Sequence, residues 1–542
     1  MRRLSSFLAN HAAPALHTLF VLVKQGVVRP MRPDKLARIA LAYRRWGITL
    51  PLGFAVGAAR HPDRPAVIDE RGALSYAELA TRTTRLAAAL RDRVPGKTRI
   101  GVLTRNHHGP VEVIVAAAKL GVDVVLLNVG LSTRQLADVL AEQDISVLVL
   151  DEEFTGHLAD LPGDLDVVLG WVEGLTEHDT LDHLIATGEG KRLARPKRHS
   201  RLIVLTSGTT GTPKGARRPD PPSLNPAAAV FSRIPLRAGE RVLLSAPLFH
   251  TWGIAGFQLS AVLGATLVLR RKFDAVDALR TVQRHRIGAM FGVPVMLQRM
   301  LDLPAEEREK FDTSSLRIVA ASGSALPGDL ATTFQRAFGP VLHNLYGSTE
   351  VSWVSIATPA DLRAAPASAG RPPRGTVVRI LDDNGEAVRR GDVGRIFAGN
   401  DMLFDGYTNG NSRERRDGLM STGDLGRFDH SGRLFIAGRE DDMIISGGEN
   451  IYPKETEDVI AGLTGVAEAA VIGVEDADFG QRLAAFVVAR EKGSLDADQV
   501  RDHVRGRVSK FAIPRDVIFL DELPRNATGK VVPAELRTHL DG

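Results

Sequence analysis

The feature that most constrains the fold is an alternation, between about residues 70 and 350, of short apolar runs and longer helical patterns. Runs such as IGVLT, SVLVL and RIVAA are short enough for buried strands, whereas PVEVIVAAAKLG and STRQLADVLAEQ have the length and periodicity of helices. Strands that alternate with helices predict parallel sheets covered by helices. The larger part of the chain is therefore expected to be an α/β domain.

A smaller unit follows residue 440. Its apolar runs EAAVIGV, LAAFVVA and DVIFL alternate with the helical patterns PKETEDVIAGL and ADQVRDHVRGRV. About a hundred residues of mixed strands and helices suffice for a separate small domain, and a length of 542 residues favours two or more domains. We expect a helical extension over residues 1–59, a large domain over 60–440 and an α+β domain over 441–542.

Composition narrows the function classes. Hydrophobic residues make up 44% and charged residues 25% of the chain, as in ordinary globular proteins. The balance of 69 Lys and Arg against 64 Asp and Glu leaves a net charge of +5, too small over this length to indicate a nucleic acid partner. The absence of cysteine excludes disulfides, thiolate metal sites and a cysteine nucleophile.

The amino-terminal segment differs from the rest. Residues 13–27 form an apolar run without a clear cleavage site and too short to span a bilayer, which disfavours a signal peptide and a membrane span. The next stretch places Leu36, Ile39 and Tyr43 at helical spacing among basic residues. Such a helix either packs on the protein body or lies on an anionic membrane surface. We favour packing on the protein body. We expect a cytoplasmic protein, with peripheral membrane association as the alternative.

The stretch LTSGTTGTPKG, residues 205–215, follows the apolar run RLIVL. Glycines let backbone N–H groups converge on an anion, and hydroxyls and a lysine add further donors. Pro213 precedes Lys214 and Gly215 follows it, so this is not a Walker A loop. A flexible surface loop is the alternative. The phosphate-binding candidates are Thr206, Ser207, Gly208, Thr209, Thr210 and Lys214.

Three further segments carry candidates for a nucleotide site. In HNLYGSTE, Tyr346 offers an aromatic face, Asn344 an amide for a purine edge, and Glu350 a carboxylate for Mg²⁺. The small residues of ASGSALPG would let a flat ring approach the backbone. STGDLG is expected to place Asp424 in a tight turn. A helix-capping Glu350 and a turn-forming Asp424 are the structural alternatives.

Six motifs occur together, in the order LTSGTTGTPKG, PLFHTWG, LYGSTE, STGDLG, GREDDMIISGGENIYP and PRNATGK. Over roughly residues 60–535, they resemble the adenylate-forming superfamily, in its acyl-CoA synthetase (fatty acid–CoA ligase) family. The resemblance implies a large N-terminal domain of parallel sheets, helices and a distorted barrel, joined by a hinge to a small mobile C-terminal domain. It also implies ATP, Mg²⁺ and CoA as cofactors, with ATP and the acid bound by the large domain.

The implied reaction has two steps. The substrate carboxylate attacks the α-phosphate of ATP and releases pyrophosphate, and the acyl-adenylate then transfers its acyl group to CoA, releasing AMP. By resemblance, Lys530 bridges the carboxylate and the α-phosphate. Thr349 lies by the α-phosphate and Glu350 by Mg²⁺. The adenosine would be held by Ser322, Gly323, Ser324, Asn344, Tyr346, Gly347, Asp424 and Arg439, with Asp424 on the ribose.

The resemblance implies a rotation of the small domain between the two steps. Asp441 holds the hinge position, and Gly447 and Gly448 would leave room for the pantetheine arm of CoA. His250 is expected to position or gate the acyl group, and Trp252 to gate an acyl tunnel.

This chain departs from the family pattern at two places. Leu419 and Met420 stand where an aromatic–Arg pair is frequent, and Arg217 and Arg218 follow the phosphate loop where many members are less basic.

Alternatives stay open at this level. An amino-acid-activating domain of a peptide synthetase usually carries an Asp in the segment that here reads FHTWGIAGF, without an acid. A non-catalytic nucleotide-binding protein of the same fold and a luciferase-like oxidation of the adenylate are further alternatives. Apolar residues such as Phe249, Phe257, Phe291 and Val351 favour a hydrophobic acid. We expect a medium- to long-chain fatty acid, with an aryl acid as the alternative.

Overall fold

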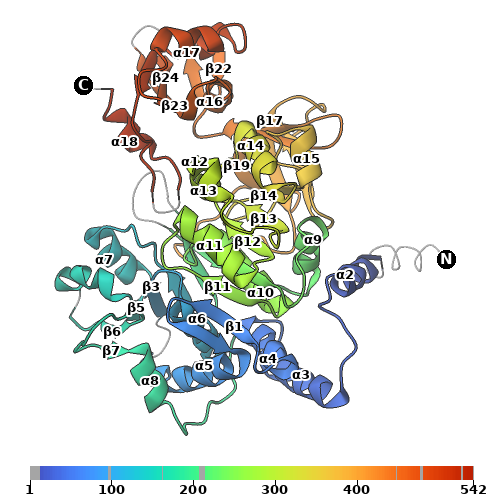
Figure 1. Cartoon of the computed structure of the whole chain (residues 1–542), viewed down its shortest axis with the longest axis vertical. Helices are drawn as coiled ribbons and strands as arrows, with labels where there is room; N and C mark the ends of the chain where they lie inside the picture. The colour runs from blue at the N-terminus through green and yellow to red at the C-terminus, as the bar shows by residue number, and fades with distance from the viewer. Residues whose placement is uncertain are drawn as a thin grey trace.

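The computed structural model describes residues 13–94, 99–161, 163–206, 214–446, 449–476, 480–526 and 529–540. Within these residues the chain forms a large N-terminal body of two mainly parallel sheets and a smaller antiparallel sheet, followed by a small C-terminal α+β unit (Figure 1). The prediction of a large α/β domain followed by a smaller α+β domain is confirmed.

The first large sheet has the strand order β7-β6-β5-β3-β4-β8-β9. Its neighbours run parallel except β8 and β9, which form an antiparallel edge. The predicted strands IGVLT and SVLVL belong to this sheet. Its strands are β3 (Arg99–Leu103), β4 (Val124–Leu126), β5 (Ile145–Leu150), β6 (Asp166–Leu169), β7 (Asp179–Thr180), β8 (Leu202–Thr206) and β9 (Lys214–Arg218).

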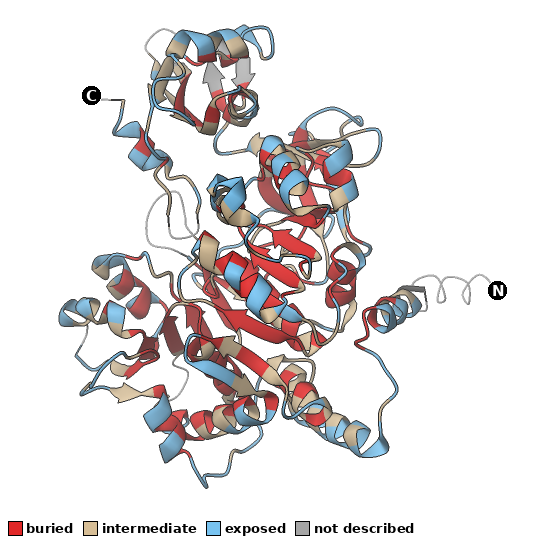
Figure 2. Ribbon diagram, viewed as in Figure 1, coloured by how far each residue is buried: buried red, intermediate tan, exposed pale blue. Residues whose placement is uncertain are grey.

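The second large sheet has the order β15-β14-β13-β12-β10-β11-β1-β2. Its central strands are parallel and buried on both faces, as their continuous apolar runs require, and its two edge pairs are antiparallel (Figure 2). The strands are β1 (Pro65–Asp69), β2 (Gly72–Ser75), β10 (Arg241–Leu244), β11 (Thr266–Leu269), β12 (Ala289–Gly292), β13 (Ile318–Ala321), β14 (Leu342–Tyr346) and β15 (Ser355–Ala357).

Helices cover both sheets. Ser75 begins α5 with a capping box, its side chain accepting from the Glu78 N–H, and Gly121 ends α6 with φ of 76°. The helices of the large body beyond residue 60 are α5 (Tyr76–Leu90), α6 (His108–Leu120), α7 (Thr133–Glu142), α8 (Leu181–Thr187), α9 (Asn225–Arg233), α10 (Thr251–Leu263), α11 (Ala275–His285), α12 (Pro294–Asp302), α13 (Ala305–Arg308), α14 (Gly328–Phe338) and α15 (Pro359–Ala364), with a 3₁₀ segment η2 (Glu152–Asp160).

An antiparallel sheet, with the order β16-β17-β19-β18 and β20 paired to β19, follows the second large sheet. One site prediction is wrong here: Asp424 lies within strand β19, opposite Arg439, and not in a tight turn. The turn residues of STGDLG are overridden by strand pairing on both sides of this segment. The strands are β16 (Val377–Leu381), β17 (Gly394–Gly399), β18 (Arg415–Arg416), β19 (Leu419–Phe428) and β20 (Leu434–Arg439).

The C-terminal unit packs two helices against its own sheet, with a separate apolar core. The predicted helix ADQVRDHVRGRV ends early, at Val504, because the chain turns at Arg505. The elements are β21 (Ile444–Ser446), β22 (Glu449–Ile451), α16 (Pro453–Ala461), β23 (Val466–Asp476), β24 (Gly480–Ala489), α17 (Ala497–Val504), η3 (Lys510–Ala512), β25 (Asp516–Phe519) and α18 (Pro533–Arg537).

In the described part of the chain, three helices precede the first strand: α2 (Ala13–Lys24), α3 (Pro33–Trp46) and α4 (Leu50–Arg60). Helix α4 is packed into the body, and α2 lies beside α9 (Figure 1). Helix α3 lies against α4, but none of its residues is buried. Of the described helices, none has both the length and the apolar character that a bilayer crossing needs.

Candidate functional site

The predicted phosphate loop begins at the carboxyl end of a parallel strand. Thr206 ends β8 and Lys214 begins the antiparallel strand β9, and the Thr206 hydroxyl donates to the Lys214 carbonyl at 3.2 Å. Ligand-binding loops in α/β sheets leave strands at this end. The predictions for Ser207, Gly208, Thr209 and Thr210 fall outside the described residues.

The predicted adenine-binding residues come from two neighbouring parallel strands. Ser322, Gly323 and Ser324 follow β13, while Asn344 and Tyr346 lie on β14. Asn344 is 8% exposed, and among the described residues its Oδ1 has no hydrogen-bond partner. An orphaned buried acceptor is costly unless a donor is supplied. An exocyclic amino group of a purine would supply that donor.

A hydrogen-bonded group links this pocket to the antiparallel sheet. The Tyr346 hydroxyl donates to Asp424 Oδ2 at 2.5 Å, and Arg439 Nη1 lies 3.7 Å from Asp424 Oδ1. Burial raises the pKa of Asp424 and outweighs the opposing effects of Tyr346 and Arg439. The carboxylate therefore has strong acceptor capacity in a desolvated position, which suits paired hydroxyl donors such as those of a ribose.

Glu350 is ionised despite being buried. Burial alone would raise its pKa, but hydrogen bonds from Tyr407 and Ser348 and the positive charge of Arg413 lower the pKa below its ordinary value. The Tyr407 hydroxyl donates to Glu350 Oε1 at 2.6 Å, and Arg413 Nε lies 3.6 Å from the same oxygen. A buried carboxylate of this kind fits Mg²⁺, a hard cation that prefers oxygen ligands. The sequence had not indicated Tyr407 or Arg413.

Arg218 has a definite role in shaping the site. It is 8% exposed, and its guanidinium donates to the Thr349 carbonyl at 2.7 Å. The Thr349 hydroxyl in turn lies 2.9 Å from that of Thr251, the first residue of α10. Arg218 therefore joins the strand after the phosphate loop to the turn that carries Thr349 and Glu350. The neighbouring Arg217 donates to the Tyr407 carbonyl at 3.2 Å.

The C-terminal unit reaches the same site. Lys530 lines a cavity together with His250, Thr349 and Gly347. The loop that carries it lies so close to the large body that a Cβ on Gly529 would come within 2.7 Å of Val295 Cγ1. Desolvation and the charge of Arg439 lower the pKa of Lys530, while Asp424 and Glu350 oppose this effect. The structure thus brings Lys530 of the C-terminal unit together with predicted residues of the large body.

His250 caps the start of α10 and is neutral. Burial and the positive charge of Lys530 lower its pKa to about 3. Its Nε2 atom is buried and, within the described part of the chain, has no hydrogen-bond partner. A neutral imidazole here can orient a ligand but carries no charge near neutral pH.

The predicted hinge residue lies between the two units. Asp441 follows β20 and precedes β21, its side chain is 60% exposed, and Arg439 Nη2 lies 3.6 Å from its carboxylate. Among the described residues, this exposed ion pair is the only one that the Asp441 side chain makes. Exposed ion pairs contribute little to stability. The predictions for Gly447 and Gly448 lie outside the described residues.

An apolar cavity of about 470 Å³ begins at Lys530 and Thr349. It follows one face of α10, lined by Thr251, Ala255, Gln258 and Val262, which spans about 16 Å at the helical rise per residue. Trp252 also lines it, with its indole N–H fixed to the Gly292 carbonyl at 3.0 Å. Further walls come from α9, α6, α4, α3, residues 27–31 and the segments 196–202 and 218–224.

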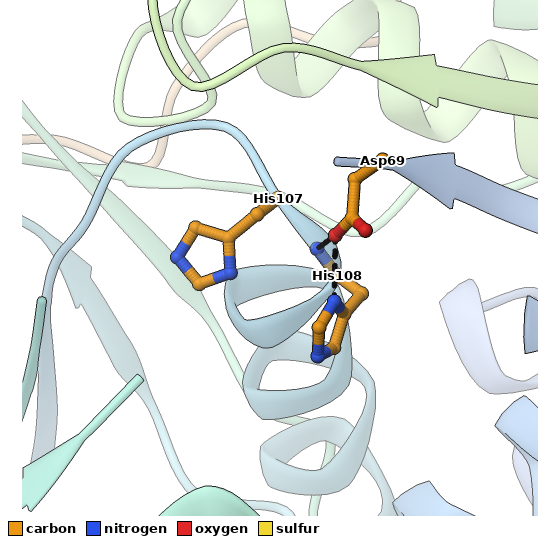
Figure 3. A group of neighbouring side chains, drawn as sticks. All are labelled: Asp69, His107 and His108. Atoms are coloured by element: carbon orange, nitrogen blue, oxygen red, sulfur yellow. Dashed lines mark hydrogen bonds and ion pairs between the residues drawn. The ribbon is translucent and has the colours of Figure 1, made fainter. Parts of the chain in front are cut away.

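A separate polar cluster lies at the start of α6 (Figure 3). His108 Nδ1 lies 2.6 Å from Asp69 Oδ2, while His107 Nε2 lies 2.8 Å from Asp151 and its Nδ1 accepts from the Gly109 N–H. Both ring nitrogens of His107 are thus used within the protein. These bonds fix the turn between β3 and α6, and we assign the cluster a structural role.

Comparison with known proteins gives a consistent result. The family model "AMP-binding enzyme" matches residues 54–408, and "AMP-binding enzyme C-terminal domain" matches residues 455–530. The indoleacetate–CoA ligase of Aromatoleum aromaticum is 33% identical over 505 residues, covering 89% of this chain and 96% of the relative. The feruloyl-CoA synthase of an Amycolatopsis species is 33% identical over 488 residues, covering 89% and 96%.

A solved structure agrees with these relatives. The O-succinylbenzoate coenzyme A synthetase of Bacillus subtilis, in complex with ATP and magnesium ion, has a TM-score of 0.77 at 28% identity, covering 90% of this chain and 99% of that one. The chain belongs to the AMP-binding, adenylate-forming enzyme family, among the acyl- and aryl-CoA ligases, which use ATP, Mg²⁺ and CoA to join a carboxylic acid to a thiol through an adenylate.

Proposed function

We propose that this enzyme activates a medium- to long-chain fatty acid and transfers it to CoA. The observation that carries the proposal is the apolar cavity that runs about 16 Å along α10 from the Thr251–Thr349 contact. An acid whose carboxylate lies at Thr349 and Lys530 would extend an unbranched apolar chain along that helix face. Burial of each further methylene would contribute about 0.8 kcal/mol, which favours longer chains.

We assign the first step to residues of both units. Lys530 stabilises the charge that develops as the carboxylate oxygen attacks the α-phosphate and the bond to pyrophosphate breaks. Thr349 would contact the same phosphate, and Glu350 would hold Mg²⁺, which when bound would neutralise phosphate charge. The orphaned Oδ1 of Asn344 accepts from adenine, Tyr346 stacks on it, and Asp424 accepts from the ribose hydroxyls, with Ser322, Gly323, Ser324, Gly347 and Arg439 completing the pocket.

We assign the second step to a rotation of the C-terminal unit about Asp441. The units we propose are residues 60–440 for ATP and acid, and 441–542 for the mobile part. Lys530 lines the cavity in this structure, and we expect that lysine to be withdrawn before a thiol reaches the acyl carbon. The Asp441 side chain makes an exposed ion pair with Arg439, which would offer little resistance to a change of backbone angles at this position. His250 would orient the acyl group in both steps.

A second candidate substrate is an aryl acid. Its support is the printed activity of two relatives, the indoleacetate–CoA ligase and the feruloyl-CoA synthase, whose substrates carry rings. Trp252, which lines the cavity and is held by packing against Phe291 at a centroid distance of 5.0 Å, would offer a ring-stacking surface. A compact aryl acid would fill only the end of the cavity nearest Lys530.

The test is AMP release that depends on both CoA and ATP, measured with purified enzyme. The panel runs from acetate to stearate and includes indoleacetate, ferulate and benzoates. We expect kcat/KM to rise along the fatty series and to peak between medium and long chains. A maximum among the ring-bearing acids, with little activity on any fatty acid, would replace the fatty-acid assignment by the aryl one.

A further inference from the structure

Exposed apolar side chains are concentrated at the amino-terminal end of the described chain. Of the twelve large hydrophobic residues that are exposed in the described structure, eight lie between residues 16 and 43. Helix α2 contacts α9, buries Val21 and Leu22, and presents an apolar strip on its other side. The strip consists of Leu16, Leu19, Phe20 and Val23, which recur at helical spacing and are 49–66% exposed.

The same amino-terminal segment is also rich in exposed basic residues. Residues 13–46 contain seven Lys and Arg against one Asp, a net charge of +6 that exceeds the +5 of the whole chain. Six of these basic residues are exposed: Lys24, Arg29, Arg32, Arg38, Arg44 and Arg45. An apolar strip on a helix with cations beside it is the pattern of proteins that lie on anionic membranes. Soluble monomers rarely expose contiguous apolar patches without a binding role.

The same segment forms the far wall of the apolar cavity. Val27, Val28 and Met31, which follow α2, line it together with Ile39 and Trp46 of α3. Val28 is 41% exposed, so the cavity reaches the surface beside the apolar strip. All of this segment precedes residue 54, where the match to the AMP-binding family begins. The extension therefore adds both a surface and a cavity wall to the family fold.

We propose that residues 13–46 dock on an anionic lipid bilayer and that a hydrophobic acid enters the cavity from the bilayer past Val28 and Met31. The docking face consists of the α2 strip and the six exposed cations defined above. An apolar acid dissolved in the bilayer would then pass into an apolar cavity without crossing water. The loading route rests on the proposed fatty-acid function, whereas the docking face does not.

The experiment measures sedimentation of the full chain with lipid vesicles. Vesicles contain either phosphatidylcholine alone or phosphatidylcholine with 30% phosphatidylglycerol, at low and high salt. The test variant is Leu16→Ser with Phe20→Ser, neither of which lines the cavity. The matched control is Leu175→Ser, which replaces a fully exposed leucine outside the extension. Activity is measured with oleate presented in the vesicles and with octanoate in water.

We expect the wild type to bind the anionic vesicles and to be released by salt, because cations supply part of the attraction. The double variant should bind about tenfold more weakly, since each buried Leu or Phe contributes appreciably to transfer from water. The activity of the double variant on vesicle-borne oleate should fall in the same proportion, and its activity on octanoate should not change. The Leu175→Ser control should match the wild type in every measurement.

Two results would overturn the proposal: no binding of the wild type to anionic vesicles, or equal binding by wild type and double variant. Unchanged activity of the double variant on vesicle-borne oleate, despite weaker binding, would overturn the loading route. Salt-sensitive vesicle binding without activity on any fatty acid would support the docking face. That last result would reject the fatty-acid function and the loading route with it.

Discussion

At the scale of single residues, the site depends on side chains that come from distant parts of the sequence. Lys530 lies near the end of the chain and Thr349 in the middle, yet both line one cavity. Arg218 holds the Thr349 carbonyl, and Tyr407 holds Glu350. These contacts position the groups that we assign to the first step. Substitution of each group should therefore have its own measurable effect.

For Lys530→Ala we predict that adenylate formation falls by about two to three orders of magnitude, because a preorganised charge at the reacting phosphate is lost. Thioester formation from supplied acyl-AMP and CoA should stay largely intact. Lys492→Ala is the control, since Lys492 is 88% exposed and forms only a surface ion pair. Pyrophosphate release and thioester yield are measured separately. Equal loss in both steps would contradict a role confined to the first.

Buried Lys119 gives a prediction about pH. Burial, with a smaller effect of Arg45, lowers its pKa from 10.5 to about 7. The unfolded chain therefore binds more protons than the folded chain between these values, and stability should rise with pH across this window. Below pH 7 Lys119 is protonated in both the folded and the unfolded state. The full cost of burying its charge then lowers the stability of the folded protein.

The matched variant is Lys119→Met, which removes the charge and keeps an unbranched side chain. As pH falls from 10 to 7, the melting temperature of the variant should rise relative to that of the wild type. The underlying difference in unfolding free energy should change by roughly 1 kcal/mol per pH unit. Thermal melts at several pH values give the comparison. A constant difference between the two proteins would mean that Lys119 is not neutral in the fold.

At the scale of elements, α10 matters because one of its faces lines the cavity along most of the helix. Ala255 lies midway along the lining face, between Thr251 and Val262. We predict that Ala255→Phe blocks the far half of the cavity and moves the maximum of kcat/KM to shorter acids, while the KM for ATP stays unchanged. The acid panel described above measures this shift. An unmoved profile would show that the acyl chain does not follow α10.

At the scale of the whole molecule, we propose that the two units change their relative orientation between the two steps. For Asp441→Pro we predict that adenylate formation persists, whereas thioester formation falls by at least about tenfold, because proline fixes φ at the hinge. Asp441→Ala keeps a free φ and serves as the control, with both activities retained. Stopped-flow measurement of each half-reaction shows which step is slowed in each variant. Loss of both steps in the proline variant alone would point to a folding defect instead.

Several features were predictable from local sequence, and others were not. The runs SVLVL and RIVAA are buried parallel strands, as their uninterrupted apolar character predicts. STGDLG misled the prediction for Asp424, because pairing with β20 outweighs the turn preference of its residues. Tyr407 and Arg413 carry no local signal for their contacts with Glu350, since these bonds span more than fifty residues.

By itself, the sequence determined the strand and helix alternation, the order of the six motifs and hence the family, because these depend on local periodicity and on short runs of residues. Only the tertiary structure decided that, among the described residues, Asn344 keeps an unpaired buried acceptor, that Arg218 supports Thr349, and that five residues between 27 and 46 line the apolar cavity. Such properties arise from burial and from contacts between distant segments, which a pattern of neighbours along the chain does not contain.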